Sequence, residues 1–164
     1  MAKKIKLTQG KCALVSNADY GDLSLHKWCA VYYPKRNGWY AERNISPTKK
    51  AKIVRMHRAI MGFPKGEDVD HIDGDTLNNT RENLRVCSRA ENCWNGTKHK
   101  DNTSGYKGVS WAKNEKKWVA KICKNYKQKN LGYFKNKLDA VVAYNNAATE
   151  LFGEFANLNI INLN

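Results

Sequence analysis

The sequence has no hydrophobic run approaching the ~20 residues that a helix needs to cross a bilayer. Residues 1–10 are basic but lack the apolar stretch of a secretory signal peptide. The hydrophobic fraction of 41% still allows a packed core, which argues against a wholly disordered chain. The 164 residues suffice for one medium domain or two small ones. We therefore expect a soluble, cytoplasmic protein with no membrane association.

Cysteine spacing lacks the patterns of a cross-linked or zinc-binding protein. There are five cysteines, and no two of them form a Cys-x-x-Cys pair. An odd number argues against a closed disulfide framework, and the missing pair removes the local signature of a zinc knuckle. We expect all five to be reduced, as in a cytosolic protein.

Acidic residues are scarce. The chain has 15 Asp and Glu against 29 Lys and Arg, which gives a formal net charge of +14. Such a charge suits a protein that binds polyanions, although it could also serve solubility alone or attract the protein to a membrane surface. Because the positive charge is clustered and alternates with aromatic residues, the sequence favours nucleic acid as the partner.

Arginine is absent from residues 98–137, which contain twelve lysines and two acidic residues. All seven arginines lie between Arg36 and Arg89. This division indicates two surfaces with different tasks, separated by a polar, glycine-bearing stretch. We predict a first module over residues 1–95, a linker over 96–104 and a second module over 105–164.

The beginning of the first module predicts short strands at residues 12–15, 28–33 and 38–41. The last two are joined by the turn from Pro34 to Gly38, in which Asn-Gly is a strong hairpin signal. A helix is predicted over residues 50–61, ending at Gly62.

The segment from Val69 to Asn95 predicts the order strand, loop, strand, helix. The strands are expected at 69–72 and 84–87, with turn residues at 73–75 and 78–79 between them. Ser88 and Glu91 have the spacing of a capping box, so a short helix should follow and end at Gly96.

The second module predicts three strands, at residues 106–111, 118–123 and 129–134. Asn136 should then cap a helix whose apolar residues recur at the 3.6-residue period of one buried face. The expected fold class is α+β, with a three-stranded antiparallel sheet packed on one helix in this module.

Asp70 and His71 have the side chains that phosphodiester hydrolysis requires, namely a ligand for a cation and a base for water. A carboxylate suits a hard metal such as Mg²⁺, and imidazole titrates near neutral pH. Asn92, in the first turn of the capped helix, is a candidate second ligand. An isolated Asp-His pair usually marks only a surface turn, and for His57 a structural role is favoured. Successive strand residues face opposite ways, so Asp70 and His71 share a site only at a twisted strand end.

Several polar motifs with regular spacing lie within about residues 6–95. They are Leu7-Thr8-Gln9-Gly10-Lys11, Met56-His57-Arg58, Val69-Asp70-His71-Ile72-Asp73-Gly74-Asp75, Asn78-Asn79, Glu82-Asn83-Leu84-Arg85 and Ser88-Arg89-Ala90-Glu91-Asn92. This set resembles the HNH homing endonucleases of phages and bacteria.

The resemblance implies a ββα-metal site. Asp70 and Asn92 would bind the metal, His71 would act as general base, and Asn83 would pin the loop and orient His71. Other branches of the family often have histidine in place of Asn92. The aspartate-asparagine pair indicates one Mg²⁺ or Mn²⁺ ion rather than Zn²⁺.

A second resemblance covers about residues 104–160. Tyr106–Trp111, Lys117–Ile122, Leu131–Phe134 and the residues from Ala140 to Asn159 resemble the Apetala/ethylene-response-factor DNA-binding domain. That family lays its sheet in the major groove. We expect nine residues to contact DNA, two of them arginines of the first module: Arg85, Arg89, Lys107, Ser110, Trp111, Lys113, Lys117, Lys121 and Lys129. Cys123 also falls close to a position that faces DNA in that family.

The plant domains use arginines where this chain has lysine, serine and cysteine, so we expect more phosphate contact and looser base reading. A merely solvated lysine face is the alternative. Taken together, the sequence predicts a metal-dependent DNA endonuclease of homing type that acts on double-stranded DNA in a bacterial host cell and is encoded by a phage. Two rivals remain open, a DNA-binding regulator with a decayed nuclease motif and an RNA-binding protein. The sequence leaves the oligomeric state open.

Overall fold

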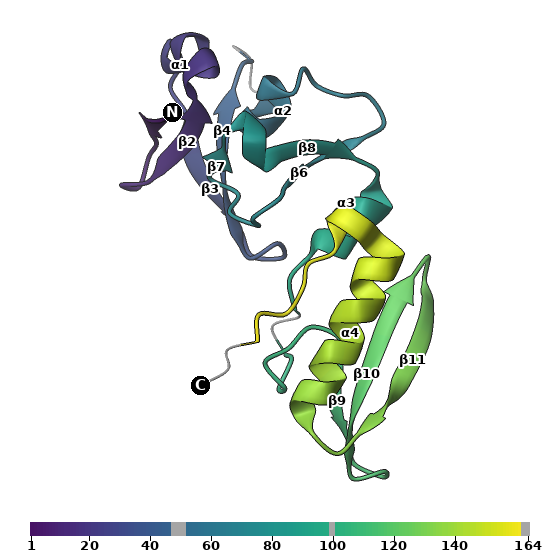
Figure 1. The fold of residues 1–164 in the computed structure, drawn as a ribbon. Helices are drawn as coiled ribbons and strands as arrows, with labels where there is room; N and C mark the ends of the chain where they lie inside the picture. The colour runs from purple at the N-terminus through teal and green to yellow at the C-terminus, as the bar shows by residue number, and fades with distance from the viewer. Residues whose placement is uncertain (47–51, 99–100, 162–164) are drawn as a thin grey trace. The chain divides into compact units, whose positions relative to one another are not determined.

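A computed structural model describes residues 1–46, 52–98 and 101–161 of the chain. The chain divides into two compact units, Met1–Arg89 and Ala90–Asn164 (Figure 1). This division falls before the linker predicted at residues 96–104, which stays a prediction. No helix in the described ranges is long and apolar enough to span a membrane.

The first unit contains three small sheets and two short α-helices. Its elements are β1 (Ala2–Lys6), β2 (Cys12–Ser16), α1 (Asn17–Ser24), β3 (Cys29–Tyr33), β4 (Gly38–Asn44), β5 (Ile53–Arg55), α2 (Met56–Ile60), β6 (Asp68–His71), β7 (Asn78–Asn79), the 3-10 helix η1 (Arg81–Asn83) and β8 (Leu84–Cys87). The sheets have the orders β1-β2-β7, β3-β4-β5 and β6-β8.

The β3–β4 hairpin and the β6–β8 pair lie where the sequence predicted strands. Asn37 has a φ of 48° in the β3–β4 turn, a conformation that Asn tolerates better than most residues. Strands β6 and β8 are antiparallel, with Asp70 opposite Arg85 and His71 opposite Leu84.

Two predictions in the first unit were wrong. The helix predicted over 50–61 is present only in part: Ile53–Arg55 instead form β5, which pairs with β4, and among the described residues of this range only Met56–Ile60 are helical. Val54 is β-branched and buried, so it is stabilised in the sheet. The first residues of that prediction, 50 and 51, lie outside the described ranges. Asn78 and Asn79, predicted as turn residues, form β7, which pairs in parallel with Leu14 and Val15 of β2.

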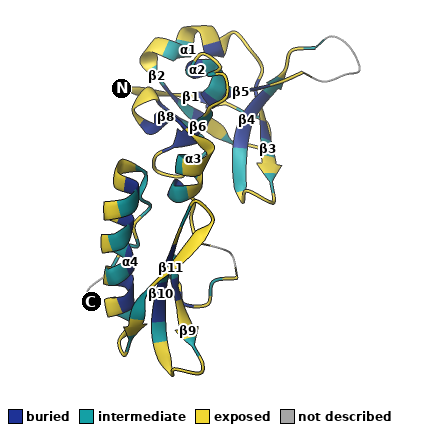
Figure 2. Ribbon diagram, turned by 90° about the vertical axis from the view of Figure 1, so that its right-hand side faces the viewer, coloured by how far each residue is buried: buried dark blue, intermediate teal, exposed yellow. Residues whose placement is uncertain are grey.

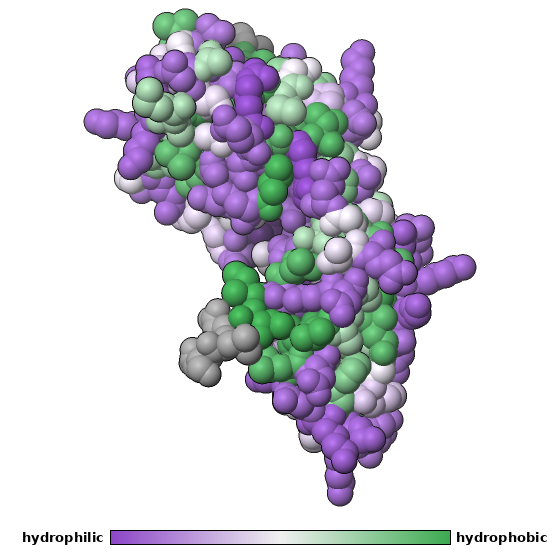
Figure 3. All heavy atoms as spheres, viewed as in Figure 1, coloured by the Kyte–Doolittle hydropathy of each residue, from purple (hydrophilic) through white to green (hydrophobic). Residues whose placement is uncertain are grey.

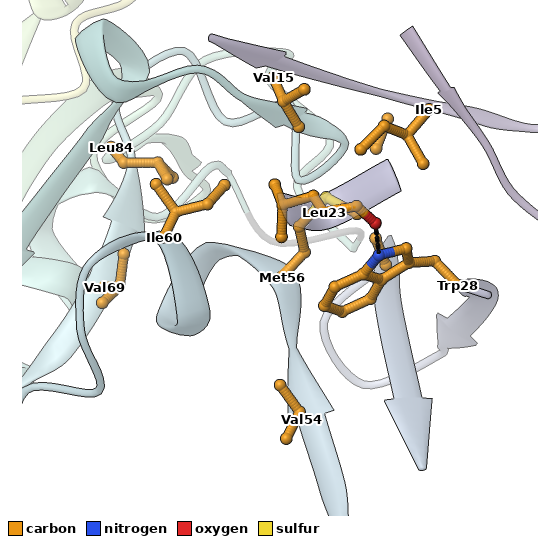
Figure 4. Close-up of a cluster of buried hydrophobic side chains, with 11 residues drawn as sticks. Ile5, Val15, Leu23, Trp28, Val54, Met56, Ile60, Val69 and Leu84 are labelled. Atoms are coloured by element: carbon orange, nitrogen blue, oxygen red, sulfur yellow. Dashed lines mark hydrogen bonds between the residues drawn. The ribbon is translucent and has the colours of Figure 1, made fainter. Parts of the chain in front are cut away.

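The core of the first unit joins its three sheets (Figure 4). Ile5, Val15, Val54, Val69 and Leu84 belong to one cluster of buried side chains that includes both strands of the β6–β8 pair. Helix α1, which the sequence did not predict, adds Leu23, whose carbonyl oxygen accepts a hydrogen bond from Trp28 Nε1 at 2.9 Å. The β6–β8 pair is therefore anchored on one face by this core.

The second unit is built on one sheet and one long helix. After α3 (Arg89–Asn95), which begins at the boundary of the units, come β9 (Val109–Ala112), β10 (Lys117–Lys124), β11 (Lys127–Phe134), α4 (Lys137–Phe152) and the 3-10 helix η2 (Gly153–Phe155). The antiparallel sheet has the order β11-β10-β9. The predicted strands are present, although β9 begins at Val109 rather than Tyr106. The Asn136 side chain caps α4 by accepting a hydrogen bond from the Leu138 amide at 2.9 Å.

Helix α4 covers one face of this sheet, as the dark side of the helix shows in Figure 2. Its buried residues Ala140, Val141, Tyr144 and Ala148 pack with Ile122 and other apolar residues of the strands. Trp94 of α3 stacks on Phe152 with ring centroids 4.8 Å apart. Figure 3 shows hydrophilic side chains over much of the visible surface of each unit, which fits the charge of the sequence.

Candidate active site

The β6–β8 pair presents two faces with different chemistry. Because strand side chains alternate, Val69 and His71 point to one face and Asp70 to the other. Val69 and Leu84, which stands opposite His71, belong to the hydrophobic core, so His71 lies at the edge of that core. Asp70 shares the other face with Arg85. Adjacent residues of the chain thus have separate surroundings.

Asp70 is a buried carboxylate, 7% exposed, held by one arginine. Its Oδ2 accepts hydrogen bonds from Arg85 Nε at 3.0 Å and from Nη2 at 2.8 Å. Both side chains of this ion pair are largely shielded from water. The pair fixes the orientation of the Asp70 carboxylate. The structure therefore gives Arg85 a supporting role beside Asp70, while its predicted contact with DNA stays a prediction.

His71 is 5% exposed, and Asn79 is its described hydrogen-bond partner. Its Nε2 lies 3.3 Å from Asn79 Oδ1. The ring of His57 packs edge-on against it, with centroids 5.0 Å apart, and Tyr40 lies near both rings. These neighbours leave the His71 ring little freedom to rotate.

Burial decides the charge of the two histidines. It lowers the pKa of His71, although the Asn79 hydrogen bond and the nearby Asp70 act in the opposite direction. Burial also lowers the pKa of His57 to about 3, with further lowering by the neighbouring His71 and by arginines that include Arg55. Both rings are therefore neutral at pH 7, and a neutral imidazole has a lone pair that can accept a proton.

Asn79 is the side chain at this site that the sequence interpretation missed. It is 1% exposed, and its Nδ2 is buried without a hydrogen-bond partner in the described part of the chain. A buried, unsatisfied amide group costs about 1–3 kcal/mol, a cost that functional sites often carry. Asn79 lies in the Asn-Asn motif, but its burial results from the pairing of β7 with β2, which the motif alone does not show.

Asn83 holds the loop between β6 and β8. Its Nδ2 donates to Asp73 Oδ1 and to the Asn78 carbonyl oxygen, both at 2.8 Å, and its Oδ1 accepts from the Asp73 amide at 3.0 Å. These bonds agree with the expectation that Asn83 pins the loop. The side chain that accepts a hydrogen bond from His71, however, is Asn79. Any orienting effect of Asn83 on His71 would have to act through the loop.

Asn92, the predicted second metal ligand, lies in helix α3 within the second unit. Its role as a metal ligand beside Asp70 stays a prediction. Among the described residues, no group of three or more His, Cys, Asp and Glu side chains could hold a metal ion. The donor that the structure does present, an ionised carboxylate oriented by an arginine, has the chemistry that Mg²⁺ or Mn²⁺ prefers.

The predicted DNA contacts have different surroundings. Those that are exposed lie on β9, in the β9–β10 turn and at the start of β10; they are Ser110, Trp111, Lys113 and Lys117. Arg89 is exposed too, 3.8 Å from Asp68. Lys129 is exposed but pairs with Ile122, so it points to the side of the sheet that α4 covers.

Lys107 and Lys121 are half-buried. Lys107 does not point outward: its Nζ donates to the Trp94 carbonyl oxygen at 2.6 Å. The contact of each of these residues with DNA stays a prediction.

All five cysteines are free thiols, and Cys87 alone is buried.

Comparison with known proteins places this site in a family. The sequence profile of a family described as HNH endonuclease matches residues 56–93, which include Asp70, His71, Asn79, Asn83 and Asn92. An uncharacterised HNH endonuclease of Acanthamoeba polyphaga mimivirus is 33% identical over 141 residues, covering 82% of this chain and 71% of that protein. The chain belongs to the HNH endonuclease family, and this membership points to a nuclease.

A second relative is Protein 3.8 of Escherichia phage T7. It is 41% identical over 94 residues, covering 57% of this chain and 77% of that protein. The mimivirus match is longer than either unit of this chain, so that relative resembles parts of both units. No solved structure matches the chain. The resemblance of the second unit to the Apetala domain therefore stays a prediction.

Proposed function

We propose that this protein is a metal-dependent endonuclease that hydrolyses phosphodiester bonds in double-stranded DNA, with His71 as the general base. The observation that carries the proposal is the surroundings of His71 within the family-matched segment. Its imidazole is buried, hydrogen-bonded through one nitrogen and of lowered pKa. Such a group is held in the neutral form that a general base needs.

The hydrogen bond to Asn79 assigns roles to the two ring nitrogens. Because Asn79 Oδ1 can only accept, Nε2 of His71 carries the proton and donates it. Nδ1 then keeps its lone pair and takes a proton from the water that attacks the phosphorus atom. Packing of His57 against His71 keeps the ring in this orientation.

Asp70 and Asn92 are the residues that would hold the metal ion. A bound Mg²⁺ or Mn²⁺ supplies charge stabilisation for the phosphate and for the departing 3′ oxygen. Arg85 orients the Asp70 carboxylate. Asn83 fixes the loop that follows His71.

The second unit would hold the DNA substrate, through the exposed lysines of the β9–β10 turn and of the start of β10. One relative comes from a phage of Escherichia, which supports a phage-encoded nuclease that acts in the cytoplasm of an infected bacterium; the homing type rests on the resemblance of the polar motifs. Lysines contact phosphates as point charges and read bases poorly, so most of the affinity should be electrostatic.

A plasmid-nicking assay tests the proposal. Wild-type protein should convert supercoiled plasmid to the open form with Mg²⁺ and should not do so with excess EDTA. His71→Ala should lose this activity while binding duplex DNA as the wild type does, and the exposed His26→Ala serves as the matched control. Retained DNA binding without nicking by the wild type would instead favour a non-catalytic DNA-binding regulator.

A further inference from the structure

The second unit contains a cavity at the open edge of strand β10. Strand β9 pairs with β10 only from Lys117 to Ala120, and beyond this point the edge borders a cavity of about 290 Å³. The cavity lies between β10, the end of α3 and the chain that follows α3. We call it the lysine pocket, after its polar lining residues Lys98, Asn102, Lys107, Lys121, Gln128 and Tyr144.

The lysine pocket is positively charged. Three lysines line it, and no Asp or Glu does. Lys107 Nζ donates to the Trp94 carbonyl oxygen at 2.6 Å, and Lys98 Nζ donates to the Gly105 carbonyl oxygen at 2.8 Å. None of the three forms an ion pair with any described residue. Neutral carbonyl groups leave the positive charge of this pocket uncompensated.

Two groups in the lysine pocket have room for a further partner: Lys107 has no anionic partner, and Tyr144 has no hydrogen-bond partner among the described residues. Burial lowers the pKa of Lys107 to about 8, and no neighbouring acidic group that the structure describes acts in the opposite direction. Tyr144 is 3% exposed, and its hydroxyl group has no hydrogen bond to any described residue. Burial raises its pKa to about 12, so the hydroxyl remains a donor. A cation and a donor that lack an anionic partner are the groups that bind an oxyanion.

The wall of the pocket is fixed by close packing at Gly108. This residue has a φ of +73°, and its carbonyl oxygen accepts a hydrogen bond from the Lys121 amide at 2.8 Å. A Cβ atom there would lie 2.1 Å from the Tyr144 ring. Only glycine allows the chain after Lys107 to approach α4 and β10 so closely. The lysines and the tyrosine are thus held around the cavity before any ligand binds.

We propose that the lysine pocket binds a phosphate group, carried on the end of a nucleic-acid strand or on a free nucleotide. This inference rests on the proposed action of the protein on DNA, but it assigns a site separate from the His71 site. A concave pocket of this volume is small for a ligand site and fits a terminal phosphate with part of its nucleoside. Lysine is an established donor for phosphate oxygens, and the Tyr144 hydroxyl adds a further hydrogen bond.

Titrations of the full-length protein without divalent metal test the proposal. Inorganic phosphate, a deoxynucleoside monophosphate and short single-stranded DNA with or without a 5′-phosphate are added at constant ionic strength, and amide NMR shifts are followed. The amides of Gly108, Lys121 and Tyr144 should move first. If the strand end is the source, the 5′-phosphorylated strand binds more tightly than the strand without it. If a free nucleotide is the source, the monophosphate binds more tightly than either strand.

Variants supply the controls. Lys107→Met and Lys121→Met keep the length of the side chain and should each weaken phosphate binding by ~10-fold, as expected for a charged hydrogen bond. Tyr144→Phe keeps the buried ring and should weaken binding by a smaller factor. Lys135→Met, at an exposed position after β11, should have no effect. Equal weakening by Lys135→Met, or unchanged binding in all three pocket variants, would overturn the proposal.

The two proposals fail in different ways. If the wild type binds phosphate in the pocket but does not nick DNA with Mg²⁺, the pocket proposal stands and the nuclease proposal is wrong. If the wild type nicks DNA but the amide NMR signals of the pocket do not shift, the nuclease proposal stands and the pocket proposal is wrong. Because the titrations contain no divalent metal, DNA cleavage does not affect their result.

Discussion

The two units hold their positive charge in contrasting ways. In the first unit, two arginines are bound to buried carboxylates, Arg85 to Asp70 and Arg55 to Glu42. In the second unit, lysines dominate, and no described lysine forms an ion pair. Arginine, with its rigid fork of donors, fixes the geometry of a site, whereas unpaired lysines leave charge available to a polyanion. The comparison supports a division between a unit that positions reacting groups and a unit that holds phosphate.

Replacing Arg85 should show the largest effect on stability. Arg85→Met leaves the buried Asp70 without its arginine, and breaking such a pair typically costs ~3–5 kcal/mol of unfolding free energy. The matched control is Arg81→Met, because Arg81 pairs with Asp19 but its own side chain is 54% exposed. Exposed pairs contribute about 0–1 kcal/mol.

Urea unfolding of both variants measures this difference. Similar losses for Arg85→Met and Arg81→Met would remove the structural distinction between the buried arginine and the exposed one.

Acid should destabilise the first unit through its buried histidines. The pKa of His57 is about 3 when folded against an ordinary value near 6.5, so the unfolded chain binds more protons between these pH values. The free energy of unfolding therefore falls as the pH falls from 6.5 towards 3, by up to ~1.4 kcal/mol per pH unit for each such histidine. His57→Phe should flatten this dependence in thermal melts, and His26→Gln should not. An unchanged slope in His57→Phe would contradict the burial of that ring.

Asn79 should act on the rate rather than on substrate binding, because it contacts His71 and not DNA. Asn79→Ala removes the acceptor for Nε2, and a lost hydrogen bond of ~1–1.5 kcal/mol corresponds to a kcat about 10-fold lower with KM unchanged. Asn79→Asp should raise the pKa of His71, since a carboxylate stabilises the imidazolium form. As the pH is lowered, the nicking rate of Asn79→Asp would then begin to fall at a higher pH than the wild-type rate. A merely structural role would lower stability without moving that pH profile.

The exposed lysines of the second unit should affect salt dependence more than specificity. If Lys113 and Lys117 each contact a phosphate, replacing either with Met reduces the slope of log Kd against log salt concentration by ~0.9. Lys124→Met is the internal control, because Lys124 Nζ donates to the Leu151 carbonyl oxygen. Fluorescence anisotropy at several salt concentrations measures the slopes, and equal slopes in all variants would argue against DNA contact by this hairpin.

Much of the β6–β8 pair, which carries the candidate site, was predictable from the sequence. The strands that carry Asp70, His71 and Arg85 follow from local turn and β-branched residues, and the polar motifs marked the site. Asn79 was missed because its burial depends on the pairing of β7 with β2, more than sixty residues earlier in the chain. No local pattern encodes that pairing.

Tertiary packing also explains the other differences. Residues 53–55 have a sequence that fits a helix as well as a strand, and the edge of β4 decides in favour of the strand. The resemblance places Lys107 at the DNA surface, which stays a prediction; the hydrogen bond from its Nζ to the Trp94 carbonyl oxygen is a contact that the local sequence did not indicate. In both cases a distant partner, rather than the local residues, decides the outcome.

The dependence of the single-turnover nicking rate on pH tests the central claim most directly. With saturating Mg²⁺, the wild-type rate should stay level from pH 8 to below 6.5 and fall only at lower pH, because burial lowers the pKa of His71. His71→Ala should be slower by ~10²–10⁴-fold, the usual contribution of a general base, and should lack that fall. A His71→Ala protein that nicks at the wild-type rate would contradict the account.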